Sequence, residues 1–323
     1  MSTAVAEVLR LHELRVQFPN ASGRSVVALD GISLAVERGE ALGIVGEPGS
    51  GKTVVALSVI GMVPPPAEVT GSIRLLGHEL VGMVEQEWWR VRGRDVAMVF
   101  PDARHSLNPI RTIGSQIEEA VNRQYEGYPR TMTRPWVRER TLDALAWAGV
   151  SRPRQRFGNY PHQLTGDLRQ RVMIALAGAN RPPLFIADEP TAGIGDAVQA
   201  QVMLHLLRRV LGTAALVLGT REPGVAAAVC KRVVVIHAGR IVESGPTDRV
   251  LTTPRHPYTA ELLELTPGTQ AADLGRGRPG CAFAARCPNA MEQCRRVRPP
   301  LEVLDDRLVA CWNPWVSTHE GGG

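Results

Sequence analysis

The sequence predicts an α/β fold: a parallel β-sheet carrying a glycine-rich loop, preceded by an antiparallel β-subdomain, interrupted by a helical insertion and followed by a small cysteine-rich module. The apolar run Ala41–Val45 leads directly into the glycine-rich Gly46–Thr53 and the helix-compatible Val54–Met62. Strand, loop and helix in this order are typical of parallel α/β units. Strand patterns return later in the chain, at residues 184–187, 214–218 and 233–237.

The remaining parts follow from local patterns. Short strands of an antiparallel sheet are predicted within residues 9–36, where apolar residues alternate around Leu14 and Val26. The helix-like stretches 113–120 and 137–147, broken by prolines, predict a helical subdomain. After Pro254 proline, glycine, arginine and four cysteines become frequent, which indicates a separate module. The expected domains are a main domain over residues 8–250, with the helical subdomain at about 101–163, and a module over 251–323.

Composition limits the class of protein. The 323 residues, 44% of them hydrophobic, suffice for a substantial core. No apolar run reaches the roughly 18 residues of a membrane span, and the amino terminus lacks a basic region followed by an apolar segment. We therefore expect a soluble protein that reaches a membrane only through a partner. The net charge of +5 is carried by dispersed arginines, so a nucleic-acid partner is not favoured.

A complete phosphate-binding loop, the Walker A pattern, occupies Gly46-x4-Gly51-Lys52-Thr53. Glycines allow the backbone N–H groups to turn inward around phosphates, and the start of the next helix adds positive potential. Lys52 is expected to bridge the β- and γ-phosphates of ATP, and the Thr53 hydroxyl to bind Mg²⁺. The alternative interpretation is a glycine-rich turn that matches the pattern by chance, but such a turn does not explain the flanking strand and helix. The predicted nucleotide-binding residues here are Gly46, Glu47, Pro48, Gly49, Ser50, Gly51, Lys52 and Thr53.

A second apolar strand, residues 184–187, ends in Asp188 and Glu189, as in a Walker B motif. Apolar residues carry the acids to the sheet edge, where Asp188 can hold Mg²⁺ through water and Glu189 can polarise the attacking water as the catalytic residue. Two solvated acids after a core strand are the alternative interpretation, which the upstream phosphate loop disfavours.

Several stretches resemble one family. Residues 160–175 resemble the signature region of ATP-binding-cassette (ABC) ATPases, and residues 186–191 resemble their Walker B. The segments 105–109 and 256–259, with the cysteine module beyond, resemble the oligopeptide, dipeptide and nickel importer branch. The resemblance implies a P-loop NTPase (RecA-like) fold in which two ATPase domains pair head to tail. Each ATP then lies between the Walker motifs of one domain and the signature loop, here Thr165 and Gly166, of the other.

The resemblance also implies a function and partners. It predicts an ATP-binding subunit that powers import of peptides or related solutes, at the cytoplasmic face of the membrane. Its partners would be a second ABC ATPase in a heterodimer, two transmembrane permease subunits and an extracytoplasmic solute-binding protein. Phe18 is the candidate for stacking on adenine, although a buried strand Phe fits equally. The alternatives are a soluble ABC ATPase acting on nucleic acid or ribosomes and a non-hydrolysing regulatory pseudo-ATPase.

Four positions depart from the family pattern. Pro101 stands where a Mg²⁺-binding glutamine is usual, and Asp167 replaces a glycine of the signature. Gly195 replaces an interdomain aspartate, and Arg221 aligns with the switch histidine, which unlike arginine can relay a proton. Arg221 can still contact a γ-phosphate. We expect ATP binding with impaired hydrolysis at the chain's own Walker site and a more conventional partner ATPase.

The cysteine module has the spacing C-x5-C-x6-C-x16-C. Four clustered cysteines in a cytosolic protein indicate a metal site before disulfides, and the spacing alone leaves zinc, an iron–sulfur cluster and reduced structural thiols open. Residues 279–288 resemble a carboxy-terminal motif of peptide importer ATPases, which favours a [4Fe–4S] cluster with zinc as the alternative. The predicted ligands are Cys281, Cys287, Cys294 and Cys311.

Overall fold

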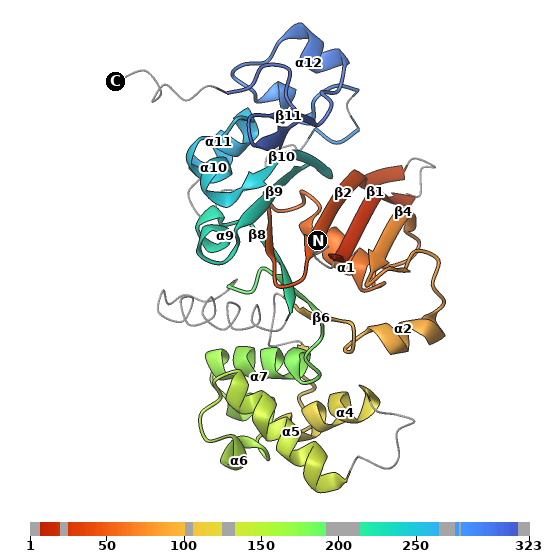
Figure 1. Cartoon of the computed structure of the whole chain (residues 1–323), viewed down its shortest axis with the longest axis vertical. Helices are drawn as coiled ribbons and strands as arrows, with labels where there is room; N and C mark the ends of the chain where they lie inside the picture. Colours follow the sequence, from red (N-terminus) through yellow and green to blue (C-terminus); the bar gives the residue numbers. More distant parts are fainter. Residues whose placement is uncertain are drawn as a thin grey trace, which may run out of the picture. The chain divides into compact units, whose positions relative to one another are not determined.

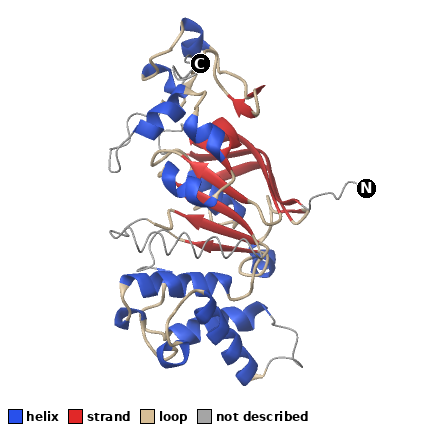
Figure 2. Ribbon diagram, turned by 60° about the vertical axis from the view of Figure 1, so that its left-hand side comes forward, coloured by secondary structure: helices blue, strands red, loops and turns tan. Residues whose placement is uncertain are grey.

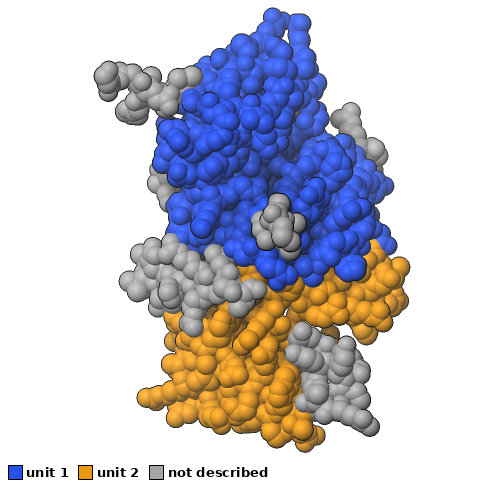
Figure 3. All heavy atoms as spheres, viewed as in Figure 1, with its two compact units in different colours: residues 1–82, 217–323 blue, residues 83–216 orange. Residues whose placement is uncertain are grey.

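The computed structural model describes residues 7–19, 25–100, 106–124, 133–191, 214–264, 275–277 and 279–315. The chain divides into two compact units (Figure 3). Unit 1 comprises Met1–Gly82 and Val217–Gly323, and unit 2 comprises Met83–Leu216.

Unit 1 contains the predicted antiparallel sheet, whose strands lie side by side in Figure 1. Its strands are longer than the sequence suggests, because β1 and β2 continue through irregularities in their register. Glu13 in β1 has a left-handed φ of 47°, and a Cβ at Gly71 would lie 2.4 Å from the Glu13 carbonyl oxygen. Glycine is therefore required where β4 faces this bulge. The strand order is β2 (Ser25–Glu37), β1 (Glu7–Pro19), β4 (Glu68–Leu75), β5 (His78–Glu79).

The second sheet of unit 1 contains the predicted buried strand. All five residues of β3 (Ala41–Val45) are buried, as expected for a strand covered on both faces. β3 pairs in parallel with β9, and β9 turns at Ala238 and Gly239 into the antiparallel β10. The order is β11 (Glu302–Leu304), β12 (Arg307–Val309), β10 (Arg240–Pro246), β9 (Arg232–His237), β3 and β8 (Ala215–Thr220), and the boundary between the units falls within β8.

The cysteine-rich segment is tied to this sheet. β12 pairs with β10, with Glu243 opposite Val309. Glu243 is fully buried, and its carboxylate accepts hydrogen bonds from the backbone N–H groups of Arg255 at 3.0 Å and His256 at 2.9 Å, while the Arg307 guanidinium lies 3.4 Å away. A buried carboxylate needs such partners. The helices of unit 1 are α1 (Lys52–Val59), α9 (Pro223–Val229), α10 (Thr247–Thr252), α11 (Pro257–Glu264), η2 (Ala282–Ala285) and α12 (Glu292–Arg296).

Unit 2 contains a parallel pair of strands and the helices of the insertion, which Figure 2 shows as a group. Thr133 caps α5 by accepting the Trp136 N–H at 3.4 Å, and Trp147 packs so closely on Gly178 that a Cβ there would lie 2.5 Å from the indole. The two predicted helical stretches, 113–120 and 137–147, are both helical. The first continues to Gln124, and the second begins earlier, at Arg134. The elements are α2 (Glu85–Val91), β6 (Val96–Val99), α4 (Ile113–Gln124), α5 (Arg134–Trp147), α6 (Pro153–Arg156), η1 (Pro161–Gln163), α7 (Gly166–Gly178) and β7 (Leu184–Asp188).

In the described part of the chain, no helix has both the length and the apolar character needed to cross a bilayer. The domain bounds 8–250, 101–163 and 251–323 stay predictions.

Candidate nucleotide-binding site and cysteine cluster

The glycine-rich loop connects β3 to α1, as the sequence predicts. A Cβ at Gly46 would lie 2.3 Å from the carbonyl oxygen of Ile236, and Gly51 has a φ of 122°. Both positions therefore require glycine for close packing or for backbone conformation. No side chain caps α1 at Gly51, and the positive end of the helix dipole faces the loop.

Lys52 lies over the loop that precedes it. Its side chain is buried, and its Nζ donates hydrogen bonds to the carbonyl oxygens of Gly46 at 2.7 Å and Glu47 at 3.1 Å. Thr53, the predicted Mg²⁺ ligand, is exposed at the second position of α1. An ammonium group held by carbonyl oxygens can exchange them for phosphate oxygens without leaving the loop.

Residues far along the chain also contact this loop. The Glu47 N–H donates to the Tyr258 hydroxyl at 2.9 Å, and the Glu47 carboxylate accepts from Arg286. Arg276 donates to the Gly49 carbonyl oxygen, and at 2.8 Å to that of Val27. Sequence reasoning missed these contacts, because side chains more than 200 positions away from the loop leave no local spacing signal.

The Walker B residues lie in unit 2, at the end of β7. Asp188 is buried, and Glu189 is half-buried with a left-handed φ of 45°. A non-glycine residue in this conformation is strained, and strain of this kind concentrates at functional sites. Gln170 of α7, not predicted from sequence, donates to the Pro190 carbonyl oxygen at 3.1 Å and holds the segment after Glu189.

The signature residues Thr165 and Gly166 are exposed at the start of α7, and a Cβ at Gly166 would meet open space. The Thr165 hydroxyl donates to the Asp167 carboxylate at 2.5 Å, and Arg171 Nε lies 3.7 Å from the other carboxylate oxygen. The charge of Asp167 therefore has a local counterion.

The other predicted site residues are dispersed. Phe18 is half-buried in β1 opposite Val26, and Arg221 is exposed just after β8. Pro101 and Gly195 lie outside the described residues. The structure thus brings the residues of Gly46–Thr53 together in unit 1 and Asp188 and Glu189 together in unit 2.

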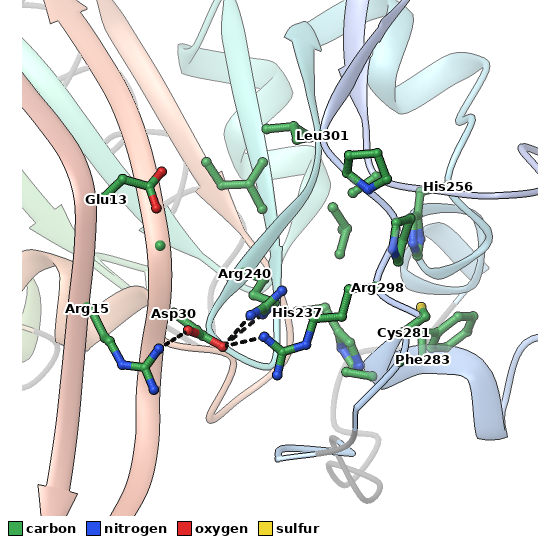
Figure 4. Close-up of a pocket in the computed structure, with 18 residues that line it drawn as sticks. Glu13, Arg15, Asp30, His237, Arg240, His256, Cys281, Phe283, Arg298 and Leu301 are labelled. Atoms are coloured by element: carbon green, nitrogen blue, oxygen red, sulfur yellow. Dashed lines mark hydrogen bonds and ion pairs between the residues drawn. The ribbon is translucent and has the colours of Figure 1, made fainter. Parts of the chain in front are cut away.

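Unit 1 also contains a cavity of about 360 Å³, whose lining includes no residue of Gly46–Thr53 (Figure 4). On one side Asp30 accepts hydrogen bonds from Arg15 at 2.7 Å, Arg298 at 3.2 Å and Arg240 (Figure 4). Three guanidinium groups around one carboxylate join β1, β2, β10 and the carboxy-terminal segment. The other side is formed by His237, His256, Cys281 and Phe283.

The four cysteines predicted as ligands line one small cavity of about 10 Å³, with Phe283 and Trp312 beside them. Among the described residues, no group of three or more His, Cys, Asp or Glu side chains is arranged to hold a metal ion, so the predicted metal site is not seen in this structure. Burial raises the pKa of the Cys281 and Cys287 thiols, and that of Cys311 to about 11. Without a cation these three groups are neutral thiols at pH 7.

Comparisons with known proteins agree with this fold and loop. The family described as ABC transporter matches residues 29–192, and the family described as oligopeptide/dipeptide transporter, C-terminal region, matches residues 242–294. The dipeptide transport ATP-binding protein of Escherichia coli K12 is 38% identical over 95% of this chain and 97% of its own length. That of Bacillus subtilis is 38% identical over 95% of this chain and 94% of its own length.

Solved structures are similar in fold. A dimeric ATP-binding cassette in a post-hydrolysis state, bound to ADP and phosphate, has a TM-score of 0.65 and 23% identity over 74% of this chain and 98% of that one. The α/β sheet, phosphate loop and helical insertion thus define a P-loop NTPase. The chain belongs to the ABC transporter ATP-binding family. It spans about half, 52%, of the length of the mycobacterial oligopeptide transport ATP-binding proteins that it matches at 38% identity.

Proposed function

We propose that this chain is an ATP-binding subunit of an ABC importer for peptides or related small solutes. The observation that carries the proposal is the buried Lys52, folded over a phosphate loop between β3 and α1. The carboxy-terminal region adds support, because it matches the family described for oligopeptide and dipeptide transporters. ATP would be held by the loop Gly46–Thr53, and the Walker patterns make Thr53 and Asp188 the residues expected to serve its Mg²⁺.

The test of this function is nucleotide binding by the full-length chain. Lys52→Ala should abolish MgATP binding in titration calorimetry, since it removes the ammonium that Gly46 and Glu47 hold at the loop. Arg38→Ala, an exposed change outside the loop, is the control. Unchanged ATP affinity in the Lys52 variant would contradict the assignment.

We also propose that the chain works in a complex at the cytoplasmic face of the membrane. Its partners are a second ABC ATPase, two permease subunits and an extracytoplasmic solute-binding protein. The exposed Thr165 and Gly166 support a paired arrangement, because a signature loop can reach the γ-phosphate of a partner's site only from an open surface. Co-purification with membrane proteins would support this arrangement, and co-purification with nucleic acid or ribosomes would contradict it.

We propose further that the chain's own Walker site hydrolyses ATP slowly. Glu189 remains to polarise water. Arg221 cannot relay a proton as histidine does, and Pro101 lacks a side-chain ligand for Mg²⁺ and a backbone N–H. ATP is then held for long times at this site, while a more conventional site carries most of the turnover.

Finally, we propose that the four cysteines hold a thiolate-bound metal group, a [4Fe–4S] cluster in preference to zinc. Their convergence on one cavity supports the donor set, and such clusters take four cysteine ligands. A cavity of about 10 Å³ is smaller than an iron–sulfur core. Binding of such a group would require the four thiols to lose their protons, because thiolates are its ligands. The bound group would supply a rigid cross-link for this part of the chain.

A further inference from the structure

Glu47, the second residue of the phosphate loop, is held on two sides by residues from the carboxy-terminal part of the chain. It is 5% exposed, and its N–H donates to the Tyr258 hydroxyl at 2.9 Å. Its carboxylate accepts two hydrogen bonds from Arg286, at 3.3 Å and 3.0 Å. We call these contacts of Tyr258 and Arg286 the Glu47 clamp. Both main chain and side chain of Glu47 are fixed by them.

The clamp reaches the group that meets the phosphates. The Glu47 carbonyl oxygen accepts a hydrogen bond from Lys52 Nζ at 3.1 Å, so one residue connects Tyr258, Arg286 and the lysine ammonium. The backbone orientation at Glu47 sets the position of its carbonyl oxygen. Because Lys52 Nζ is hydrogen-bonded to that oxygen, the same orientation sets the position of the ammonium group. A loop fixed before ATP arrives loses less conformational entropy on binding than one that must become ordered.

The two side chains of the clamp are themselves held in place. Arg286 Nη2 also lies 3.0 Å from Glu261 Oε1, and its guanidinium stacks 5.2 Å from the Phe283 ring centre. Tyr258 is fully buried, its N–H donates to His256 Nδ1 at 3.0 Å, and its ring lies 4.2 Å from that of His237. Neither side chain can leave Glu47 without breaking these contacts.

Charge explains why a cation is needed at this position. The Glu47 carboxylate is buried, and its charged neighbour in the clamp is Arg286, while His237 Nδ1 lies 3.7 Å away. Burial lowers the pKa of His237 to about 3, so this ring is neutral at pH 7. Without Arg286 an uncompensated carboxylate would remain inside the protein, and the loop would have to move to hydrate it.

We propose that Arg286 and Tyr258 are positioning residues for nucleotide binding: they act through Glu47 to hold the phosphate loop ready for ATP. This inference rests on the proposed ATP-binding function. It adds that the carboxy-terminal module contributes to ATP affinity, although neither residue belongs to the Walker motifs.

The experiment is MgATP titration calorimetry on the full-length chain and its variants. Arg286→Gln should weaken ATP binding by roughly tenfold or more, since it removes two charge-assisted hydrogen bonds. Arg286→Lys keeps the charge and one hydrogen bond, so it should restore part of the affinity. Tyr258→Phe should weaken binding by a smaller factor, about threefold, because it removes one neutral hydrogen bond. Arg296→Gln, an exposed change in α12, is the matched control and should have no effect.

The stoichiometry separates positioning from simple destabilisation. A purely structural role lowers the number of ATP sites per chain at unchanged Kd, whereas positioning raises Kd at unchanged site number. If the Arg286→Gln variant keeps the wild-type Kd while Lys52→Ala abolishes binding, the Glu47 clamp is refuted and the proposed function stands. If the wild-type chain does not bind ATP, the proposed function is itself refuted, independently of the Glu47 clamp.

Discussion

The Thr165 hydroxyl donates a 2.5 Å hydrogen bond to the Asp167 carboxylate at the start of α7. In an ABC pair this hydroxyl would face the γ-phosphate bound by the partner. Asp167 accepts the hydrogen bond that the hydroxyl could otherwise donate to the phosphate, and it adds a negative charge near that phosphate. Arg171, 3.7 Å away, offsets part of that charge. The residue that departs from the family pattern is thus integrated into the local hydrogen bonding of the loop.

Asp167→Gly should raise ATP turnover by the assembled complex, because it frees the Thr165 hydroxyl and removes repulsion toward the γ-phosphate. An increase of roughly three- to tenfold corresponds to about 1 kcal/mol in the barrier. Steady-state ATP hydrolysis measures it. The converse variant Arg171→Gln, which removes the counterion, should lower turnover, and equal rates in both variants would show that this carboxylate does not reach the partner's site.

Glu189→Gln should leave most of the ATPase activity of the complex intact, because the site that contains Glu189 is proposed to turn over slowly. The equivalent change in the partner ATPase should remove nearly all activity. Both variants are compared by phosphate release at saturating MgATP. Loss of essentially all activity in the Glu189 variant would show that this chain's site is the working one.

Purification without oxygen should give a brown chain with broad visible absorbance and cysteine-bound iron. Cys287→Ser should reduce the iron content and the absorbance, whereas Cys230→Ser, a buried cysteine outside the cluster, should leave both unchanged. Iron analysis and absorption spectra measure the effect. One equivalent of zinc and a colourless chain would reject the iron–sulfur cluster and retain the metal site.

Acid should destabilise the fold through two buried histidines. Burial lowers the pKa of His237 and His256 from 6.5 to about 3. Between these values the unfolded chain binds more protons than the folded one, so the free energy of unfolding falls as the pH decreases from 6.5 toward 3. The limit is about 1.4 kcal/mol per pH unit for each histidine.

Urea unfolding at pH 7 and pH 5 measures this effect. His237→Gln should reduce the difference in stability between the two pH values, and His78→Gln, at an exposed histidine, should not. Identical pH dependence in both variants would assign the acid sensitivity to other groups.

Local patterns predicted the strand Ala41–Val45 and the loop after it, because a short apolar run and fixed glycine positions are properties of adjacent residues. The length of β1 was not predicted, since the bulge at Glu13 depends on Gly71 of another strand. The contacts of Tyr258 and Arg286 with the loop could not be predicted for the same reason. They join segments that only the folded sheet brings together.

Glu243 in β10 binds the backbone at Arg255 and His256, and β12 extends the same sheet. The predicted boundary between the main domain and the carboxy-terminal module is therefore crossed by buried hydrogen bonds and by strand pairing. A chimaeric protein joined near residue 254 would take Glu243 from one parent sequence. The backbone at Arg255 and His256 and the strand β12, which Glu243 and β10 contact, would come from the other. Recombination between related chains would have to exchange both regions or neither, so the two segments are expected to share one evolutionary history.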